Sequence, residues 1–357
     1  MPGQQRATGG PAPWESGLVI VDKPGGLTSH DVVARIRRLA HTRRVGHAGT
    51  LDPMATGVLV IGIEKATRLL GHLMLTEKVY EATIRLGQST TTDDAEGQPT
   101  GAALRPATSV TREALDTEIA KLTGDIQQVP SSVSAIKVNG QRAYKLTRAG
   151  EAPELAARPV TVYEFRVTAT REAGDFLDVD ATVRCSSGTY IRALARDLGA
   201  ALGTGGHLTA LRRTAVGPYT LAQARTLEDL QTEDPTPAPE RVRLTPDPHP
   251  VPQRPADAGA PPPAAAQPAP PGGAPAAPAV IPLAAAAAAA FPRLDLTGDD
   301  ARRLAQGARL PLPPSAPASP DGSDAPVAAF APDGTLVALV AADNGCLRSL
   351  AVFTGQS

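Results

Sequence analysis

The residues best suited to chemistry lie between Arg44 and Leu59, a segment in which Asp52 is the single acid. Three glycines, together with the proline after Asp52, predict a fixed, irregular loop that runs into a strand. Loops of this kind commonly hold reactive groups against a rigid sheet. A single carboxylate does not match the paired acids of a glycosidase. An isolated Asp before Pro is most often a turn residue, so the local pattern leaves both a structural and a catalytic interpretation of Asp52 open.

The rest of the chain offers no cofactor chemistry. It contains neither a Gly-x-Gly-x-x-Gly fingerprint nor a Walker A motif, so nucleotide-cofactor folds have no support. Cys185 and Cys346 lie far apart in the chain, and the six histidines lack the spacing of metal ligands. We therefore expect no cofactor and no metal site.

Strands and helices must position Asp52, and the sequence predicts both around it. Apolar or alternating runs predict strands at 17–21, 58–63, 79–86, 160–168 and 177–183. Amphipathic spacing predicts helices after a capping box at 28–31, over 111–122 and over 190–202. These elements are interleaved without strict alternation. That order favours an α+β fold with a mixed or antiparallel sheet over a doubly wound fold.

Composition divides the 357 residues into four parts. Residues 1–16 are rich in Gly, Pro, Ala and Gln, and we expect a disordered tail. Residues 17–231 contain the Asp52 loop and the predicted core. Residues 232–282 are dominated by Pro, Ala and Gly, which predicts an extended linker. Residues 283–357 are predicted to form a small β-rich unit.

That C-terminal unit has its own sequence signals. Thr297 is the expected N-cap of a helix, and Asp333-Gly334 is a hairpin turn signal. No apolar run reaches the ~20 residues that a membrane helix needs. The chain also lacks the pattern of a signal peptide, so a cytoplasmic protein is expected.

Charge alone does not identify a partner, because the formal net charge is -1. Basic residues nevertheless gather in two stretches, at 23–68 and 184–213. If the two stretches meet in space, they form the footprint expected for a phosphate backbone. Ordinary solvated helix faces would explain them equally well.

A series of ordered motifs resembles one family. The Asp52 loop, Gly46-His47-x-Gly49-x-Leu51-Asp52-Pro53-x-Ala55-x-Gly57-Val58-Leu59, resembles the catalytic motif of the TruB-type tRNA pseudouridine-55 synthases. Other motifs of that family are matched in order between about residues 17 and 220: Lys23-Pro24-x-Gly26-x-Thr28-Ser29, Lys78-x-Tyr80, Asp94-Ala95-Glu96-Gly97, Gln128-x-Pro130, Cys185-Ser186-x-Gly188-Thr189-Tyr190-Ile191-Arg192 and Leu211-Arg212-Arg213. The residues from 283 onward resemble, more weakly, the PUA-like domain that ends these enzymes.

The resemblance implies the pseudouridine synthase fold and an isomerisation. Uracil is detached from its ribose, turned, and rejoined through carbon 5. By this resemblance Asp52 is the nucleophile, and Arg192 is its partner, because a bidentate guanidinium keeps a carboxylate charged and aimed. Tyr80 packs on the target base, and its hydroxyl acts as, or assists, the general base at carbon 5. Without the resemblance, Arg192 would be read as a surface arginine and Tyr80 as a packing residue of a strand.

The resemblance also implies the residues that contact the substrate. His47 is inserted into the RNA loop beside the extruded nucleotide, with a turn-capping role as the alternative. Lys23, Tyr190 and Leu211 line the pocket, although a leucine is by default a core residue. Asp94 holds the active-site loop or the RNA, and a purely structural role is equally compatible with its position.

The implied substrate is the T-arm of tRNA. Its target uridine is stacked, so the enzyme must flip it out, at a cost of a few kcal/mol. An RNA-gripping insertion at about 125–152 and the basic stretches would hold phosphates, largely by shape, so binding should weaken as salt rises. The insertion allows direct binding of tRNA, so no guide RNA is expected, and a monomer suffices. The alternatives are a guide-RNA-dependent relative that acts on ribosomal RNA and an RNA chaperone that folds tRNA without chemistry.

Overall fold

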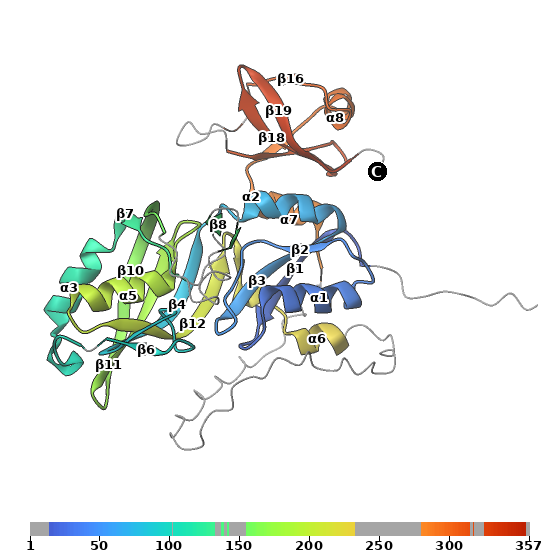
Figure 1. Ribbon diagram of the computed structural model, residues 1–357. Helices are drawn as coiled ribbons and strands as arrows, with labels where there is room; N and C mark the ends of the chain where they lie inside the picture. The colour runs from blue at the N-terminus through green and yellow to red at the C-terminus, as the bar shows by residue number, and fades with distance from the viewer. Residues whose placement is uncertain are drawn as a thin grey trace, which may run out of the picture.

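Two β-sheets dominate the computed structural model (Figure 1). The structure describes residues 14–101, 103–132, 155–232, 280–314, 317 and 325–354, together with the backbone of 137–138 and 141–142. Nearly all of the predicted tail and linker, and most of the predicted insertion, lie outside these residues.

The larger sheet carries the expected catalytic part and is mixed. Within the described residues its main path runs in the order β14 (Ile281–Pro282), β1 (Gly17–Lys23), β3 (Thr56–Ile63), β12 (Gly206–Val216), β4 (Lys78–Leu86), β11 (Phe176–Cys185), β10 (Arg158–Ala173) and β7 (Gly124–Gln128). Two short strands join it, β2 (Val45–His47) beside β3 and β13 (Tyr219–Thr220) beside β12. Neighbouring strands are antiparallel except β3 and β12, which are parallel. The predicted α+β fold with a mixed sheet is confirmed.

Helices and short hairpins complete the described chain. The helices are α1 (Ser29–Leu39), α2 (Leu70–Leu73), α3 (Arg112–Lys121), α5 (Ile191–Ala201), α6 (Leu227–Thr232), α7 (Leu283–Ala290) and α8 (Gly298–Ala305), with 3₁₀ turns η1 (Glu64–Leu69), η2 (Ala107–Ser109) and η3 (Leu221–Gln223). The hairpins are β5 (Ser89–Thr90) with β6 (Pro99–Thr100), and β8 (Lys137–Val138) with β9 (Gln141–Arg142). The predicted capping box is confirmed, because the Thr28 and Asp31 side chains each bond the other's backbone at the start of α1.

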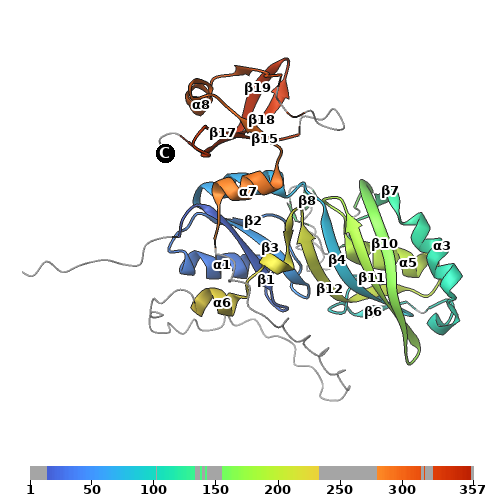
Figure 2. The same cartoon turned by 180° about the vertical axis from the view of Figure 1, so that it is seen from behind.

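Strands β1 and β3 are buried on both faces, which explains their continuous apolar sequences. Val19 and Val21 of β1 pack into a core with Ile36 of α1. Leu18 and Ile20 point the other way, into a second core that includes α7. Figures 1 and 2 show α1 and α7 on opposite sides of this part of the sheet.

The C-terminal unit is the predicted β-rich one. Its sheet runs in the order β15 (Arg293–Asp295), β17 (Val327–Phe330), β18 (Leu336–Asp343), β19 (Cys346–Val352) and β16 (Leu310–Pro311). Thr297 caps α8, as predicted, by accepting a hydrogen bond from the Asp300 amide. Helix α7, a leucine followed by seven alanines, lies between the two sheets (Figure 2). Small side chains allow this close approach, and the Tyr219 hydroxyl donates to the Ala286 carbonyl at 2.8 Å.

Several elements were not predicted from the sequence, among them β14 and β12. Ile281–Pro282, assigned to the linker, forms β14 and pairs with β1. No strand was predicted over 206–216, yet β12 is a central strand beside β4. Its polar residues break the expected alternation, and they are satisfied inside the protein: His207 Nδ1 lies 2.8 Å from the Gln88 carbonyl oxygen, and Arg213 Nε donates to the Val58 carbonyl.

Gly57 of β3 pairs with Arg213 of β12, and its replacement by alanine should destabilise the protein strongly. Its φ is +102°, and a Cβ there would lie 2.2 Å from the carbonyl oxygen of Arg213. Both groups belong to paired backbones, so neither can move cheaply. We expect Gly57→Ala to lower the free energy of unfolding by about 3 kcal/mol or to prevent folding.

Urea unfolding measures this effect. The control is Gly71→Ala, because Gly71 lies in α2 with open space around its Cβ position. That substitution should be neutral or stabilising by up to about 1 kcal/mol. Equal unfolding midpoints for the two variants would contradict the close approach at Gly57.

Candidate active site

The backbone of the Asp52 loop is fixed by hydrogen bonds from the first residue of α1 and from the turn before it. The Ser29 hydroxyl accepts from the Leu51 amide at 2.9 Å and donates to the Leu51 carbonyl at 3.0 Å. The Gly26 amide donates to the Pro53 carbonyl at 2.8 Å. The residues on both sides of Asp52 are therefore tied to the turn and helix that follow β1.

Asp52, Arg192 and Asp94 form one charged network. Arg192 Nε donates to Asp52 Oδ2 at 2.9 Å. Arg192 Nη1 lies 3.5 Å from Asp94 Oδ2 and donates to the Thr92 carbonyl at 2.9 Å. The side chains of Arg192 and Asp94 are 4% and 5% exposed, whereas Asp52 is 35% exposed. A buried guanidinium thus holds a carboxylate that stays partly open to solvent.

Asp94 is itself built into the loop after β5. Its Oδ1 accepts from the Thr92 hydroxyl at 2.5 Å and from the Glu96 amide at 3.0 Å. Its carbonyl accepts from the Thr90 hydroxyl at 2.7 Å. These bonds fix the carboxylate that faces Arg192, which favours a loop-holding role for Asp94.

Tyr80 lies on β4 and is buried beside Arg213 of β12. The two residues are direct partners in the antiparallel register of these strands. Burial raises the pKa of the Tyr80 phenol, and the charge and hydrogen bond of Arg213 partly oppose that rise. Arg213 was not among the predicted site residues, although the Leu211-Arg212-Arg213 motif contained the signal. The negative charge of Asp52 also raises the pKa of the Tyr80 phenol, so Asp52 and Tyr80 belong to one site.

Lys23 lies under the loop with its ammonium bonded to backbone carbonyls. Nζ donates to Pro24 at 2.9 Å, to Leu27 at 2.8 Å and to Pro53 at 3.2 Å. Burial lowers the pKa of Lys23 to about 8, and the negative charge of Asp52 opposes that change. In this arrangement Lys23 holds the turn and the loop together.

His47 ends β2 and packs edge-on against His30, with ring centroids 5.6 Å apart. Its Nδ1 is buried and has no hydrogen-bond partner within the described part of the chain. Burial lowers the pKa of His47, so the neutral ring is favoured. A neutral, half-buried ring is suited to stacking against an inserted nucleotide.

Tyr190 and Leu211 occupy different environments. Tyr190 is half-buried at the start of α5, and the Gln128 side chain bonds its backbone amide and carbonyl at 2.8 and 3.1 Å. Leu211 is 7% exposed within the core that also contains Tyr80. Gln128 therefore fastens the end of β7, where the predicted insertion begins, to the helix that carries Arg192.

A second ion pair extends this connection. Arg196, one turn after Arg192 on α5, lies 3.3 Å from Asp93 and donates to the Val129 carbonyl at 2.7 Å. Burial raises the pKa of Asp93, and its Arg196 partner opposes that rise. Asp93 immediately precedes Asp94, so the root of the insertion is joined to the Asp52 network.

The two basic stretches do meet, partly inside the molecule. Arg192 bonds Asp52, Arg212 bonds Asp22 at 2.7 Å, and Arg213 bonds the carbonyls of the Asp52 loop. Arg192 and Arg213 hold the Asp52 loop, and all three arginines are bonded within the protein rather than free for phosphate. Other basic side chains of the first stretch remain exposed, including Arg38, Arg43, Arg44, Lys65 and Arg68.

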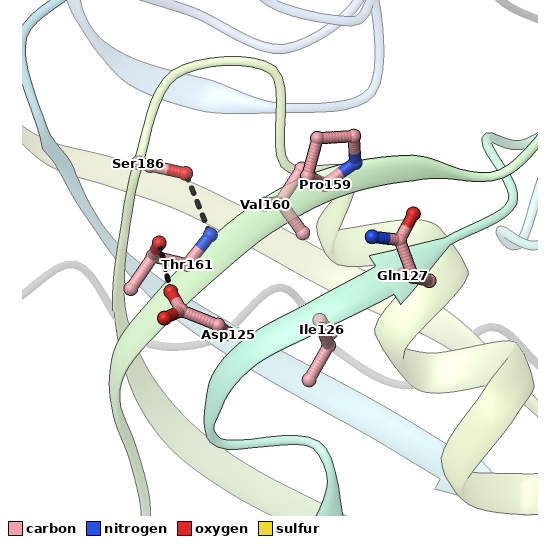
Figure 3. A pocket seen from close by; sticks show the side chains of 7 residues that line it. All are labelled: Asp125, Ile126, Gln127, Pro159, Val160, Thr161 and Ser186. Atoms are coloured by element: carbon pink, nitrogen blue, oxygen red, sulfur yellow. Dashed lines mark hydrogen bonds between the residues drawn. The ribbon is translucent and has the colours of Figure 1, made fainter.

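A pocket elsewhere on the described surface is lined by other residues than this site. The pocket, of about 220 Å³, lies over β7 and β10 (Figure 3) and is lined by Asp125, Ile126, Gln127, Pro159, Val160, Thr161 and Ser186. Its polar side chains bond within the pocket, such as Thr161 to Asp125 at 2.6 Å. Over the described residues, no group of three or more His, Cys, Asp or Glu could hold a metal ion. Among the helices described, none has the length and apolar character needed to cross a membrane.

The geometry defines what the site can do. A carboxylate reachable from solvent is held by a buried guanidinium, with a buried phenol nearby. Such a carboxylate can attack or deprotonate a group inserted beside it, and the phenol supplies a second proton-transfer group. The low dielectric of the surroundings strengthens the electrostatic interactions of the carboxylate and of the phenol with such a group.

Family comparisons match this chain over most of its length. A model described as TruB family pseudouridylate synthase (N terminal domain) matches residues 37–191. Models described as tRNA pseudouridylate synthase B C-terminal domain and tRNA Pseudouridine synthase II, C terminal, match residues 192–238 and 291–354.

Individual relatives agree with the family models. The chain is 54% identical over 344 residues to a tRNA pseudouridine synthase B of Thermobifida fusca (strain YX), covering 95% of this chain and 99% of that protein. It is 67% identical over 219 residues to a tRNA pseudouridine synthase B of Rhodococcus jostii (strain RHA1), covering 61% of this chain and 71% of that protein.

A solved structure supports the fold. The chain resembles one from the structure of an H/ACA RNP bound to a substrate RNA containing 2'-deoxyuridine, with a TM-score of 0.62, 23% identity and coverage of 95% and 85% of the two chains. At that identity the likeness concerns the fold alone.

Proposed function

This chain belongs to the TruB family of pseudouridylate synthases, and from that premise we propose that it converts uridine-55 in the T-loop of tRNA to pseudouridine. The reaction is an isomerisation, with Asp52 as nucleophile on a flipped-out nucleotide. The single observation that carries the proposal is the Asp52–Arg192 pair at 2.9 Å, which joins a partly exposed carboxylate to a buried guanidinium. Because tRNA is the proposed substrate, the proposed location is the cytoplasm.

The proposal also gives roles to Tyr80 and to the residues expected to contact the substrate. The Tyr80 ring packs on the target base, and its hydroxyl serves the proton transfer at carbon 5. His47 offers a neutral ring to the RNA loop, and Tyr190 and Leu211 border the base. Lys23 acts indirectly, by holding in place the loop that carries Asp52.

The proposed division of the chain follows the same function. Residues 17–231 form the catalytic domain, and its insertion at about 125–152 grips the T-arm. Residues 232–282 are the linker to residues 283–357, which form a PUA-like domain. Direct binding through the insertion requires no guide RNA, and one monomer serves one tRNA. The bonds from Gln128 to Tyr190 support the position of the insertion beside the site.

A tRNA transcript without modifications tests the proposal. Purified protein is incubated with the transcript alone, and pseudouridine is mapped by carbodiimide labelling and reverse transcription. We expect one strong stop, at the T-loop uridine, with no added RNA. A transcript with cytidine at that position is the control and should show no stop. Modification at another site, or only after a guide RNA is added, would exclude the proposed specificity.

A further inference from the structure

Arg213 is buried in the large sheet, and its guanidinium donates to three backbone carbonyls. The residue is 1% exposed. Nε donates to the Val58 carbonyl at 2.8 Å, Nη1 to Thr50 at 3.3 Å and Nη2 to Gly49 at 3.3 Å. The guanidinium therefore joins the first residues of β3 to the two residues that lead into the Asp52 loop.

This buried cation has no carboxylate partner among the residues that the structure describes. Across the described part of the chain, no Asp or Glu oxygen lies within 4.0 Å of Arg213, whereas Arg192 has two carboxylate partners and Arg212 has one. Burying a charge without a counter-ion is costly, and carbonyl hydrogen bonds offset only part of that cost. An apolar side chain would suit a purely structural role at this position better.

The register of the sheet places Arg213 between the two proposed catalytic groups. On one side it pairs with Tyr80 of β4, and on the other with Gly57 of β3, the strand that follows the Asp52 loop. The absence of a side chain at Gly57 lets the two backbones approach there. The charged and titratable groups that act on Tyr80 are Arg213 from β12, Cys185 from β11 and Asp52 from the loop.

We propose that Arg213 is a positioning residue that fixes the Tyr80 hydroxyl and the Asp52 loop relative to each other. Its guanidinium bonds the loop carbonyls on one side and faces the phenol on the other. The two groups must act on opposite parts of one small nucleotide, so their separation must be fixed. The inference rests on the proposed function and adds Arg213 to a site in which Arg192 contacts Asp52 directly.

Single-turnover kinetics test this role, with enzyme in excess over a tRNA transcript. Because misplacing reacting groups by about 1 Å can cost 10²-fold, we expect Arg213→Gln to lower the rate constant by about 10²-fold. Arg213→Lys keeps the charge but loses the planar fork, and it should recover roughly tenfold of that loss. Since Arg213 is buried, the Kd for tRNA, measured by filter binding, should stay within about threefold of the unaltered protein.

Arg212 provides the matched control. It is the preceding residue on β12 and is more exposed. It pairs with Asp22 and donates to the Thr56 hydroxyl at the start of β3, instead of bonding the Gly49 and Thr50 carbonyls. Arg212→Gln and Arg212→Lys should leave the single-turnover rate within about threefold, as expected for a partly exposed ion pair. Thermal unfolding of all four variants shows whether they are folded.

The outcomes separate positioning from structure. A lower rate at unchanged Kd, with partial recovery by lysine, supports the proposal. An unchanged rate overturns it, and so does a parallel loss of rate and binding. Failure of both Arg213 variants to fold also overturns it, because Arg213 would then serve the sheet alone. If the unaltered protein itself makes no pseudouridine, the proposed function fails instead.

Discussion

Asp52→Asn is expected to abolish pseudouridine formation while leaving tRNA binding intact. Asparagine preserves the shape of the side chain and can still accept a hydrogen bond from Arg192, so the loop should keep its conformation. It removes the negative charge that makes the carboxylate a nucleophile. We expect the single-turnover rate to fall by at least about 10³-fold, as is typical when a nucleophile is removed from a preorganised site.

The measurement is the time course of pseudouridine formation on a tRNA transcript, beside filter binding of the same RNA. Asp22→Asn is the control, because Asp22 is also paired with an arginine of the large sheet but lies outside the loop. It should retain most of the activity. Normal activity of Asp52→Asn would exclude Asp52 as the nucleophile. Refolding of misfolded tRNA by the inactive variant would show a chaperone activity that does not depend on chemistry.

Arg192→Lys should have the second largest effect. The guanidinium contacts Asp52, Asp94 and the Thr92 carbonyl at once, and a lysine ammonium cannot reproduce this planar arrangement. Lysine retains the positive charge beside the two carboxylates, but it no longer fixes the orientation of the Asp52 side chain. We expect a fall in rate of about 10²-fold with little change in the Kd for tRNA.

Arg196→Lys is the matched control for this prediction. Arg196 lies one turn further along α5 and is also paired with aspartates, but it does not contact Asp52. Its side chain is 27% exposed, so the change should alter the rate by no more than about threefold. Equal losses for the two substitutions would indicate that α5 as a whole, rather than the Arg192–Asp52 bond, limits the reaction.

Much of the fold follows from the sequence because its signals are local. Continuous apolar runs predicted β1 and β3, which are buried on both faces. The capping box at Thr28 and the N-cap at Thr297 depend only on residues three positions apart, so the starts of α1 and α8 were predicted correctly. The Asp52 loop was recognised because glycines and proline restrict the backbone wherever they occur.

Elements whose stability depends on distant partners were not predicted. β12 contains polar residues that a local pattern assigns to the surface, and only neighbours from β3 and β4 make the strand possible. β14 is two residues long and exists because the edge of β1 is available to pair with it. Helix α7 is too short and uniform to show an apolar face, and its place between two sheets determines its role.

The sequence by itself determined the family resemblance, the mixed α+β fold and the identity of Asp52 as the reactive candidate. Only the tertiary structure decided which basic residues serve the site. Arg192, Arg212 and Arg213 belong to one basic stretch of the sequence, yet they bond Asp52, Asp22 and the loop carbonyls respectively. The direction of a long side chain depends on strands and helices that are remote in the sequence, so charge composition cannot distinguish a positioning arginine from one that binds phosphate.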